Sequence, residues 1–192
     1  FNRQSAHKQA AKNGRRDAEQ DFGCNPCSEI ILRPYQFCNL SEVVVRETDT
    51  QQTLTEKVRL ATILGTFQST LTDFKYLRSI WKKNTEEERL LGVSLTGIMD
   101  NELTSGRSAH LGMNIGHTLE ALRDAAIDAN KAMADQLGIS QSTAITCVKP
   151  SGTVSQLVDS ASGIHARHNP YYIRTVRGDN KDPLTQFMIS QG

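Results

Sequence analysis

The sequence predicts an α/β domain built on a parallel β-sheet. Stretches rich in β-branched residues alternate along the chain with apolar patterns of helical period that extend over ten or more residues. No internal repeat or low-complexity linker divides the 192 residues, of which 38% are hydrophobic, so we expect one domain over residues 1–192. This alternation predicts βαβ units, in a sheet that is either open or closed into a barrel.

The amino-terminal part is predicted to contain a short helix, a loop and a strand. Residues 5–12 suit a polar helix that Asn13-Gly14 closes, because glycine readily adopts the left-handed conformation that ends helices. Residues 21–39 contain Gly, Pro and Cys in a pattern typical of a loop, and a short strand is predicted around "EIIL". The β-branched run over residues 40–45 predicts a strand.

Two helices are predicted to follow that strand. Apolar residues spaced by three and four indicate an amphipathic helix over residues 53–77. A shorter helix is predicted to begin at Asn84, since Glu87 three positions later completes a capping-box pattern, and to end before Gly92.

The carboxy-terminal half continues the alternation. The small-residue run "GVSLTGIMD" predicts a strand or a tight turn, and an amphipathic helix over residues 118–137 is stopped by Gly138. "STAITCV" predicts a strand, followed by the turn "KPSGT" and a helix that starts at "VSQLV". Residues 171–176, "YYIRTV", predict another strand, and Asp182-Pro183 opens a last helix because proline is favoured at the first helical position.

Composition excludes several classes of function. The 22 basic and 21 acidic residues nearly balance, so nothing favours binding to nucleic acid or to a membrane surface. No apolar run approaches the roughly 18 residues of a membrane helix, no signal peptide is visible, and we expect a cytoplasmic protein with reduced thiols. A solvated helix face is the expected role of the early basic residues, which are Arg3, Lys8, Lys12, Arg15 and Arg16.

Three of the four cysteines fall within "GCNPCSEIILRPYQFC". In an extended backbone alternate side chains share a face, so Asn25, Cys27 and Glu29 are predicted to present an amide, a thiol and a carboxylate to one small substrate. Pro26 lacks an amide hydrogen and is unsuited to a central strand, so we interpret the segment as a loop finger thrust into a cavity.

The residues themselves leave other interpretations of these thiols open. Cys24 and Cys27 have the spacing of a redox dithiol, although a strand-turn-helix context is missing. A zinc site that uses Cys38 as well would lack a fourth ligand, so no metal site is predicted. Inert, buried thiols are the remaining interpretation, and they are the simplest one for Cys147 in its predicted strand.

A second cluster, "KPSGTVS", lies between a predicted strand and a predicted helix. Its glycine lets the backbone approach a ligand, its hydroxyls are donors, and the amides at a helix start attract anions. An ordinary capped helix start is the alternative, and the pattern of a nucleotide-hydrolase phosphate loop is absent. The candidate phosphate-binding residues are Ser151, Gly152, Thr153, Val154 and Ser155.

The motif "NPCSEI" resembles the active-site finger of ribonucleotide reductases. The longer stretch "NPCSEIILRPYQFCNLSEV" is similar to the adenosylcobalamin-dependent (class II) enzymes, especially the monomeric ribonucleoside-triphosphate reductases. Further matching motifs extend the resemblance across nearly the whole chain: "FNRQSA", "GVSLTGIMD", "KPSGTVSQL" and "SGIHARHNPYYIRTVRGDNKDPL".

The resemblance implies distinct roles for the finger residues. Cys27 matches the thiyl-radical cysteine that removes the 3′ hydrogen of the ribose, and Glu29 matches the carboxylate that accepts the 3′-hydroxyl proton. Asn25 matches the amide that holds the sugar hydroxyls. Cys38 matches one of two thiols that deliver reducing equivalents, and the loop over 151–155 matches the one that grips the substrate phosphates. Cys24 departs from the family, in which we expect a small hydroxyl residue.

The resemblance also implies the setting of this chemistry. The fold would be part of a ten-stranded α/β barrel, with adenosylcobalamin as cofactor, ribonucleoside triphosphate as substrate and a thioredoxin-like reductant. A chain that begins at Phe1 looks like a fragment of this single catalytic domain, inactive alone, with the dNTP effector site mostly outside it. A ribonucleoside-diphosphate reductase of another class, a thiol-disulfide oxidoreductase and a non-catalytic nucleotide-binding module are the alternatives.

Overall fold

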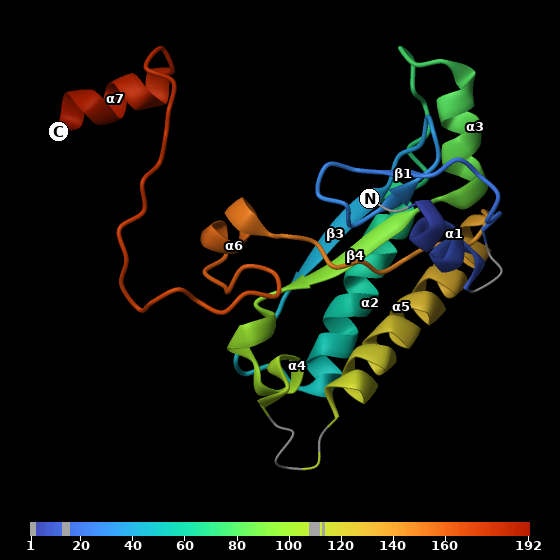
Figure 1. Cartoon of the computed structure of the whole chain (residues 1–192), viewed down its shortest axis with the longest axis horizontal. Helices are drawn as coiled ribbons and strands as arrows, with labels where there is room; N and C mark the ends of the chain where they lie inside the picture. The colour runs from blue at the N-terminus through green and yellow to red at the C-terminus, as the bar shows by residue number, and fades with distance from the viewer. Residues whose placement is uncertain (1–2, 13–15, 108–111, 113) are drawn as a thin grey trace.

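The fold is centred on a parallel βαβ unit. The computed structural model describes residues 3–12, 16–107, 112 and 114–192 (Figure 1). Strands β3 (Asn39–Val44) and β4 (Leu91–Thr96) pair in parallel along their whole length. Since parallel strands need a crossover, the chain passes between them through α2 (Gln51–Gln68) and α3 (Ser79–Glu88). The predicted α/β class and the βαβ unit are thereby confirmed.

Helices cover one face of this sheet. The 23-residue helix α5 (Ile115–Leu137) packs beside α2, and Figure 1 shows both running along the same side of β3 and β4. Gly138 ends α5 with a φ of 63°, as expected for a left-handed helix cap. Alternate strand residues supply the core between sheet and helices, whose buried members are Val43, Val45, Leu54, Val58, Leu91, Val93, Leu122, Ala126 and Ile145.

The segment that follows α5 extends the sheet by a single bridge. Thr146 bridges Val93 in parallel, the Val93 N–H donates to the Ile145 carbonyl over 2.8 Å, and the Cys147 N–H donates back to Val93 over 3.0 Å. The predicted strand "STAITCV" therefore runs beside β4 without becoming a full strand. The described residues contain a two-stranded parallel sheet and this bridged segment, so they do not by themselves form a ten-stranded barrel.

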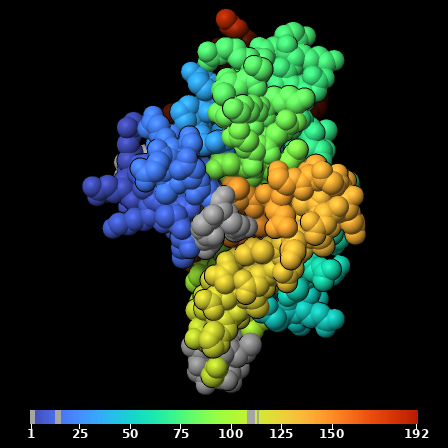
Figure 2. All heavy atoms as spheres, turned by 90° about the vertical axis from the view of Figure 1, so that its right-hand side faces the viewer, coloured from blue at the N-terminus to red at the C-terminus, as the bar shows by residue number. Residues whose placement is uncertain are grey.

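A separate amino-terminal layer lies against this unit. Helix α1 (Arg3–Ala11) and the two-residue strands β1 (Gly23–Cys24) and β2 (Ile31–Leu32) surround buried Phe22. Figure 2 shows this segment, in blue, beside α3 in green and α5 in yellow. The predicted helix and the predicted loop with short strands are confirmed, whereas the cap at Asn13-Gly14 lies outside the described residues.

The expectation of a solvated basic face is wrong for Arg16. Its guanidinium donates to both carboxylate oxygens of Glu88, over 2.9 Å each, and both side chains are under a tenth exposed. The partner carboxylate lies 72 residues further along the chain, so local sequence gives no sign of it. Arg15 lies outside the described residues.

Two helix boundaries differ from the prediction. Helix α2 ends at Gln68 rather than near residue 77, because the Ser69 and Thr70 hydroxyls donate to carbonyls of the last turn over 2.6 and 2.7 Å. Helix α3 begins at Ser79, so the capping box at Asn84 is wrong. Asn84 instead lies inside the helix and donates its amide to the Pro34 carbonyl over 2.9 Å.

The run "GVSLTGIMD" forms both predicted structures in succession. Its first residues form β4, and Gly97 then turns the chain with a φ of 79° into η1 (Ile98–Asp100) and α4 (Glu102–Ser105). A Cβ on Gly97 would lie 2.5 Å from the Val45 carbonyl oxygen, so the close approach of the two strand ends requires glycine.

The carboxy-terminal segment leaves the body of the molecule (Figure 1). The strand predicted over residues 171–176 is wrong: the segment has no β-pairing partner among the described residues, and Ile173 is 97% exposed. A β-branched run cannot form a strand without a neighbour to accept its backbone hydrogen bonds. Helix α7 (Pro183–Gln191) begins as predicted, with Asp182 accepting from the Thr185 N–H.

Among the described residues, no helix combines the length and the apolar character that crossing a membrane would require.

Candidate active site

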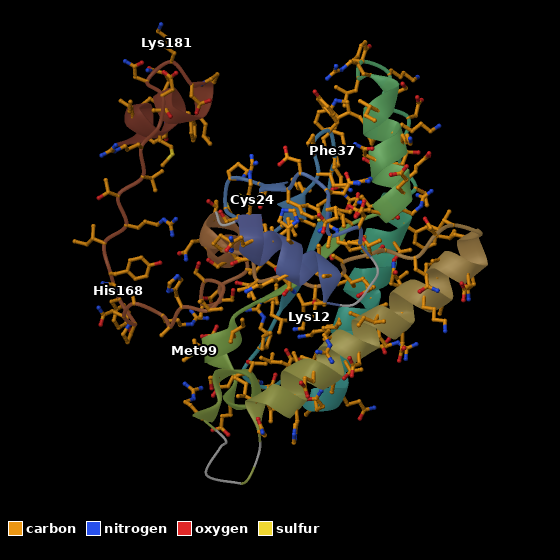
Figure 3. The ribbon with its side chains drawn as sticks, turned by 45° about the vertical axis from the view of Figure 1, so that its right-hand side comes forward. Lys12, Cys24, Phe37, Met99, His168 and Lys181 are labelled. Carbon is orange, nitrogen blue, oxygen red and sulfur yellow. The ribbon has the colours of Figure 1, made fainter. Side chains whose placement is uncertain are left out.

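The finger is a hairpin from Gly23 to Leu32. Gly23 pairs with Leu32 and Cys24 with Ile31 in the antiparallel stem. Above the stem, the Ile30 N–H donates to Asn25 Oδ1 over 3.1 Å, and this bond closes the loop. We call the stem together with Asn25 and Ile30 the base of the finger; Ile30 and the preceding Phe22 are both buried, so this base is anchored. Figure 3 labels Cys24 on the finger.

The tip of the finger is a tight turn, so the expectation of an extended backbone is wrong there. The Ser28 N–H donates to the Asn25 carbonyl over 2.9 Å, and Ser28 has a left-handed φ of 62°. A turn breaks the alternation of side chains, so Asn25, Cys27 and Glu29 are not placed on one face by an extended backbone. Cys27 is exposed at the tip, and the Asn25 amide oxygen is engaged in closing the loop.

Glu29 faces the body of the molecule. It lines a cavity of about 580 Å³, together with Arg16 from the amino-terminal layer and Thr146 from the bridged segment. Its Oε2 atom is buried and has no hydrogen-bond partner among the described residues. A buried carboxylate oxygen without a donor is costly, so this atom is suited to a ligand that brings a hydroxyl or amine.

Cys38 and Cys147 lie together near Glu29. Burial, followed by the nearby Cys147 and Glu29, raises the pKa of the Cys38 thiol to about 12. Burial, followed by Glu29, likewise raises the pKa of the Cys147 thiol to about 12. The structure thus brings Cys38 and Glu29 into one neighbourhood, as expected of two groups in one site, and adds Cys147 to it.

Sequence reasoning missed the position of Cys147. Its Sγ lies 3.2 Å from where a Cβ on Gly92 would be, so it packs over a strand residue that has no side chain. Cys147 is outside the cluster of buried residues that forms the main core. The missed signal was the alternation along β4, where glycine and serine mark the face turned away from the helices.

The thiols are expected to react with iodoacetamide in a defined order. Thiolate is the reactive form, and a pKa of about 12 leaves almost no thiolate on Cys38 and Cys147 at pH 8. Cys27 is exposed and should be alkylated first, at least about tenfold faster than either of the half-buried thiols Cys38 and Cys147. Peptide mass spectrometry of time points gives the order, and faster labelling of Cys38 than of Cys27 would contradict the geometry.

The phosphate-loop candidates lie at the start of α6 (Gly152–Leu157). The helix begins two residues earlier than predicted, with Ser151 as its cap residue. Ser151 is 1% exposed, and its Oγ atom has no hydrogen-bond partner among the described residues. Ser155 is also buried and donates to the Gly152 carbonyl over 2.9 Å. Ser151 is therefore the hydroxyl in this loop that a bound phosphate would satisfy.

The other members of this loop are more open. Gly152 and Thr153 are exposed, and the Val154 side chain is 40% exposed. Only four positions separate Ser151 from Cys147, so the loop lies within about 13 Å of the thiol along an extended backbone. The loop thus follows closely along the chain on Cys147, whose thiol lies near Glu29.

No metal site emerges from the described residues, in which no group of three or more His, Cys, Asp or Glu side chains could hold an ion. His168, labelled in Figure 3, contacts the ring of Tyr172 in the exposed segment after α6. The cavity beside Glu29 has the size that drug-sized ligands occupy. No contact with a cobalamin is assigned to this chain.

Comparison with known proteins agrees with the motifs. No protein-family model matches the chain. The adenosylcobalamin-dependent ribonucleoside-triphosphate reductase of Lactobacillus acidophilus is 31% identical over 183 residues, which cover 84% of this chain and 24% of that protein. The enzyme of the same name from Lacticaseibacillus paracasei is 33% identical, over 88% of this chain and 26% of that protein.

A solved structure gives the same result. A B12-dependent (class II) ribonucleotide reductase superposes with a TM-score of 0.58 and 25% identity, over 74% of this chain and 22% of that one. The chain spans about a quarter of the length of the curated relatives that it matches. The resemblance seen in the motifs is confirmed: the chain is homologous to a segment of the adenosylcobalamin-dependent ribonucleotide reductases.

Proposed function

We propose that this chain supplies the radical finger and the phosphate loop of an adenosylcobalamin-dependent reductase. The reaction converts ribonucleoside triphosphates to 2′-deoxyribonucleoside triphosphates for DNA synthesis. The observation that carries the proposal is the finger: a locked hairpin that exposes the Cys27 thiol at its tip while Glu29 faces a cavity. The kinship with enzymes of that name supports both the substrate class and the cofactor.

Each residue has a separate task in the proposed reaction. Adenosylcobalamin supplies the radical-generating chemistry when bound. As a thiyl radical, Cys27 takes the hydrogen atom from C3′, and Glu29 accepts the proton of the 3′-hydroxyl. The 2′-hydroxyl then leaves as water, and Cys27 returns the hydrogen atom to C3′ when the ribose has been reduced.

Cys38 and a second thiol supply the reducing equivalents for this reaction. Together they give two electrons and two protons and become a disulfide, which a thioredoxin-like reductant then reopens. Burial raises the pKa of Cys38 to about 12, so the group stays a protonated thiol at neutral pH and can deliver hydrogen. Cys24 has no assigned step; its sulfur lies 3.5 Å from the Ser28 hydroxyl.

The phosphate loop and the wider setting complete the proposal. The buried Ser151 hydroxyl and the backbone over residues 152–155 are assigned to the substrate phosphates. Residues 1–192 would form part of one catalytic domain, a ten-stranded α/β barrel, whose dNTP effector site lies mostly outside this segment. We further propose a cytoplasmic location, which suits a reaction that consumes reduced thiols.

The test uses the complete polypeptide that carries this sequence. The protein is supplied with adenosylcobalamin, a dithiol and a ribonucleoside triphosphate, and deoxynucleotide is measured by chromatography. We expect product with the cofactor and none without it, more product from the triphosphate than from the diphosphate, and no turnover by the 192-residue chain alone. A folded protein that binds nucleotide but forms no deoxynucleotide would contradict the proposal.

A further inference from the structure

A second carboxylate lies on the sheet face that is turned away from the helices. Glu42 of β3 stands opposite Ser94 of β4 in the parallel register, and the Ser94 hydroxyl lies 3.4 Å from Glu42 Oε1. The other carboxylate oxygen, Oε2, is buried without a hydrogen-bond partner among the described residues. Burial raises the pKa of Glu42, while the neighbouring Lys149 opposes that rise. Glu42 therefore lacks one donor and has a cation close by.

Lys149 connects this carboxylate to the phosphate loop. It follows Cys147 by two residues and precedes Ser151 by two, and its charge acts on both Glu42 and Cys147. In the part of the chain that the structure describes, Lys149 makes no ion pair within 4.0 Å and no side-chain hydrogen bond. Lys149, a half-buried residue whose ammonium has three donors, thus lies close enough to act on a carboxylate that lacks a donor, and it precedes by two residues a hydroxyl that lacks a partner.

We propose that Lys149 binds the phosphate chain of the nucleotide, and that Glu42 is a positioning residue that holds the Lys149 ammonium group beside the loop. One ammonium can donate to Glu42 Oε2 and to a phosphate oxygen at the same time, which satisfies both groups. The ligand class is a nucleoside polyphosphate. This inference rests on the proposed function, because it assigns the charge that the loop over 151–155 does not itself contain.

The effect of replacing Glu42 on the affinity for phosphate distinguishes two possible roles of this residue. If Glu42 acted only as a negative charge near an anion site, replacing it with glutamine would tighten the binding of phosphate. If it positions Lys149, the same replacement loosens the hold on the ammonium and weakens binding. The two roles predict opposite changes in one measured affinity.

The test is calorimetric titration of the complete polypeptide with inorganic triphosphate and with a ribonucleoside triphosphate. We expect Lys149→Gln to weaken binding of both by about tenfold or more, and to reduce the dependence of the affinity on salt. Glu42→Gln should weaken binding by a smaller factor, and Lys149→Arg should restore part of the loss. Lys131→Gln, on the exposed side of α5, removes the same charge as a control and should leave the affinity unchanged.

The outcomes separate this inference from the proposed function. If Ser151→Ala weakens binding but Lys149→Gln does not, the inference is overturned and the phosphate loop stands. Tighter binding by Glu42→Gln would overturn the positioning role. A wild-type protein that binds neither ligand would overturn both the inference and the loop assignment. Circular dichroism of each variant, with thermal unfolding, shows that affinities are compared between folded proteins.

Discussion

Replacing Cys27 with serine is expected to lower deoxynucleotide formation by the complete polypeptide about a thousandfold or more. The proposed reaction needs a sulfur-centred radical, and a serine O–H bond is too strong to be opened for this purpose. Removing the reacting group of an enzyme typically costs at least this factor. The fold should not change, because Cys27 is exposed and makes no hydrogen bond within the described structure. Product formation, nucleotide binding and thermal unfolding are measured together.

Cys24→Ser is the matched control. It makes the same atomic change three residues away on the same finger, and the hydroxyl can keep the contact that the Cys24 sulfur makes with Ser28. We expect this variant to retain most of the activity. If both variants are inactive while still binding nucleotide, the two sulfurs act as a dithiol and the radical assignment of Cys27 is wrong.

Glu88→Ala is expected to reduce the free energy of unfolding by about 3–5 kcal/mol, because it leaves a buried cation without its partner. Arg16 makes two 2.9 Å contacts to Glu88, and the two side chains are 7% and 8% exposed. The Gln36 amide also donates to this carboxylate from a buried position. Urea unfolding followed by circular dichroism gives the change in free energy.

Glu87→Ala provides the comparison at the neighbouring position. Glu87 is 43% exposed and pairs with Arg33, so its loss should cost about 1 kcal/mol or less. A double variant, Arg16→Met with Glu88→Met, should be more stable than Glu88→Ala, since an apolar pair leaves no unpaired charge. Equal losses from Glu87→Ala and Glu88→Ala would show that the Arg16 contact contributes nothing beyond a surface pair.

Local sequence patterns were sufficient to predict the helices and strands that bury a regular stripe of apolar residues. Helix α5 and strand β3 were predicted within a few residues, because periodicity and a terminal glycine or a β-branched run determine them. The start of α3 could not be predicted, since its cap residue, Arg78, makes no side-chain capping bond. The strand expected over 171–176 failed for a different reason: strand formation depends on a partner, which local sequence does not contain.

The site was predictable in its chemistry and less so in its geometry. The residue types around Cys27 pointed to a finger, and the hairpin confirms a finger-like loop. The turn at Ser28 separates side chains that an extended backbone would have aligned. The alternation along β4 indicated which face of the sheet is open, but the approach of Cys147 and Glu42 to this region depends on the register between distant strands, which local sequence does not contain.

In the finger, the residues that stabilise the fold are different from the residues at the reactive tip. Its base is fixed by buried Phe22 and Ile30 and by the Asn25 bond, while residues 26–28 at its tip bury almost nothing. A substitution at the tip should therefore change the rate of the reaction and hardly change the free energy of unfolding, whereas a substitution at the base should change both. Evolution, or an engineer, can therefore exchange reactive groups at this tip without first having to strengthen the scaffold that carries them.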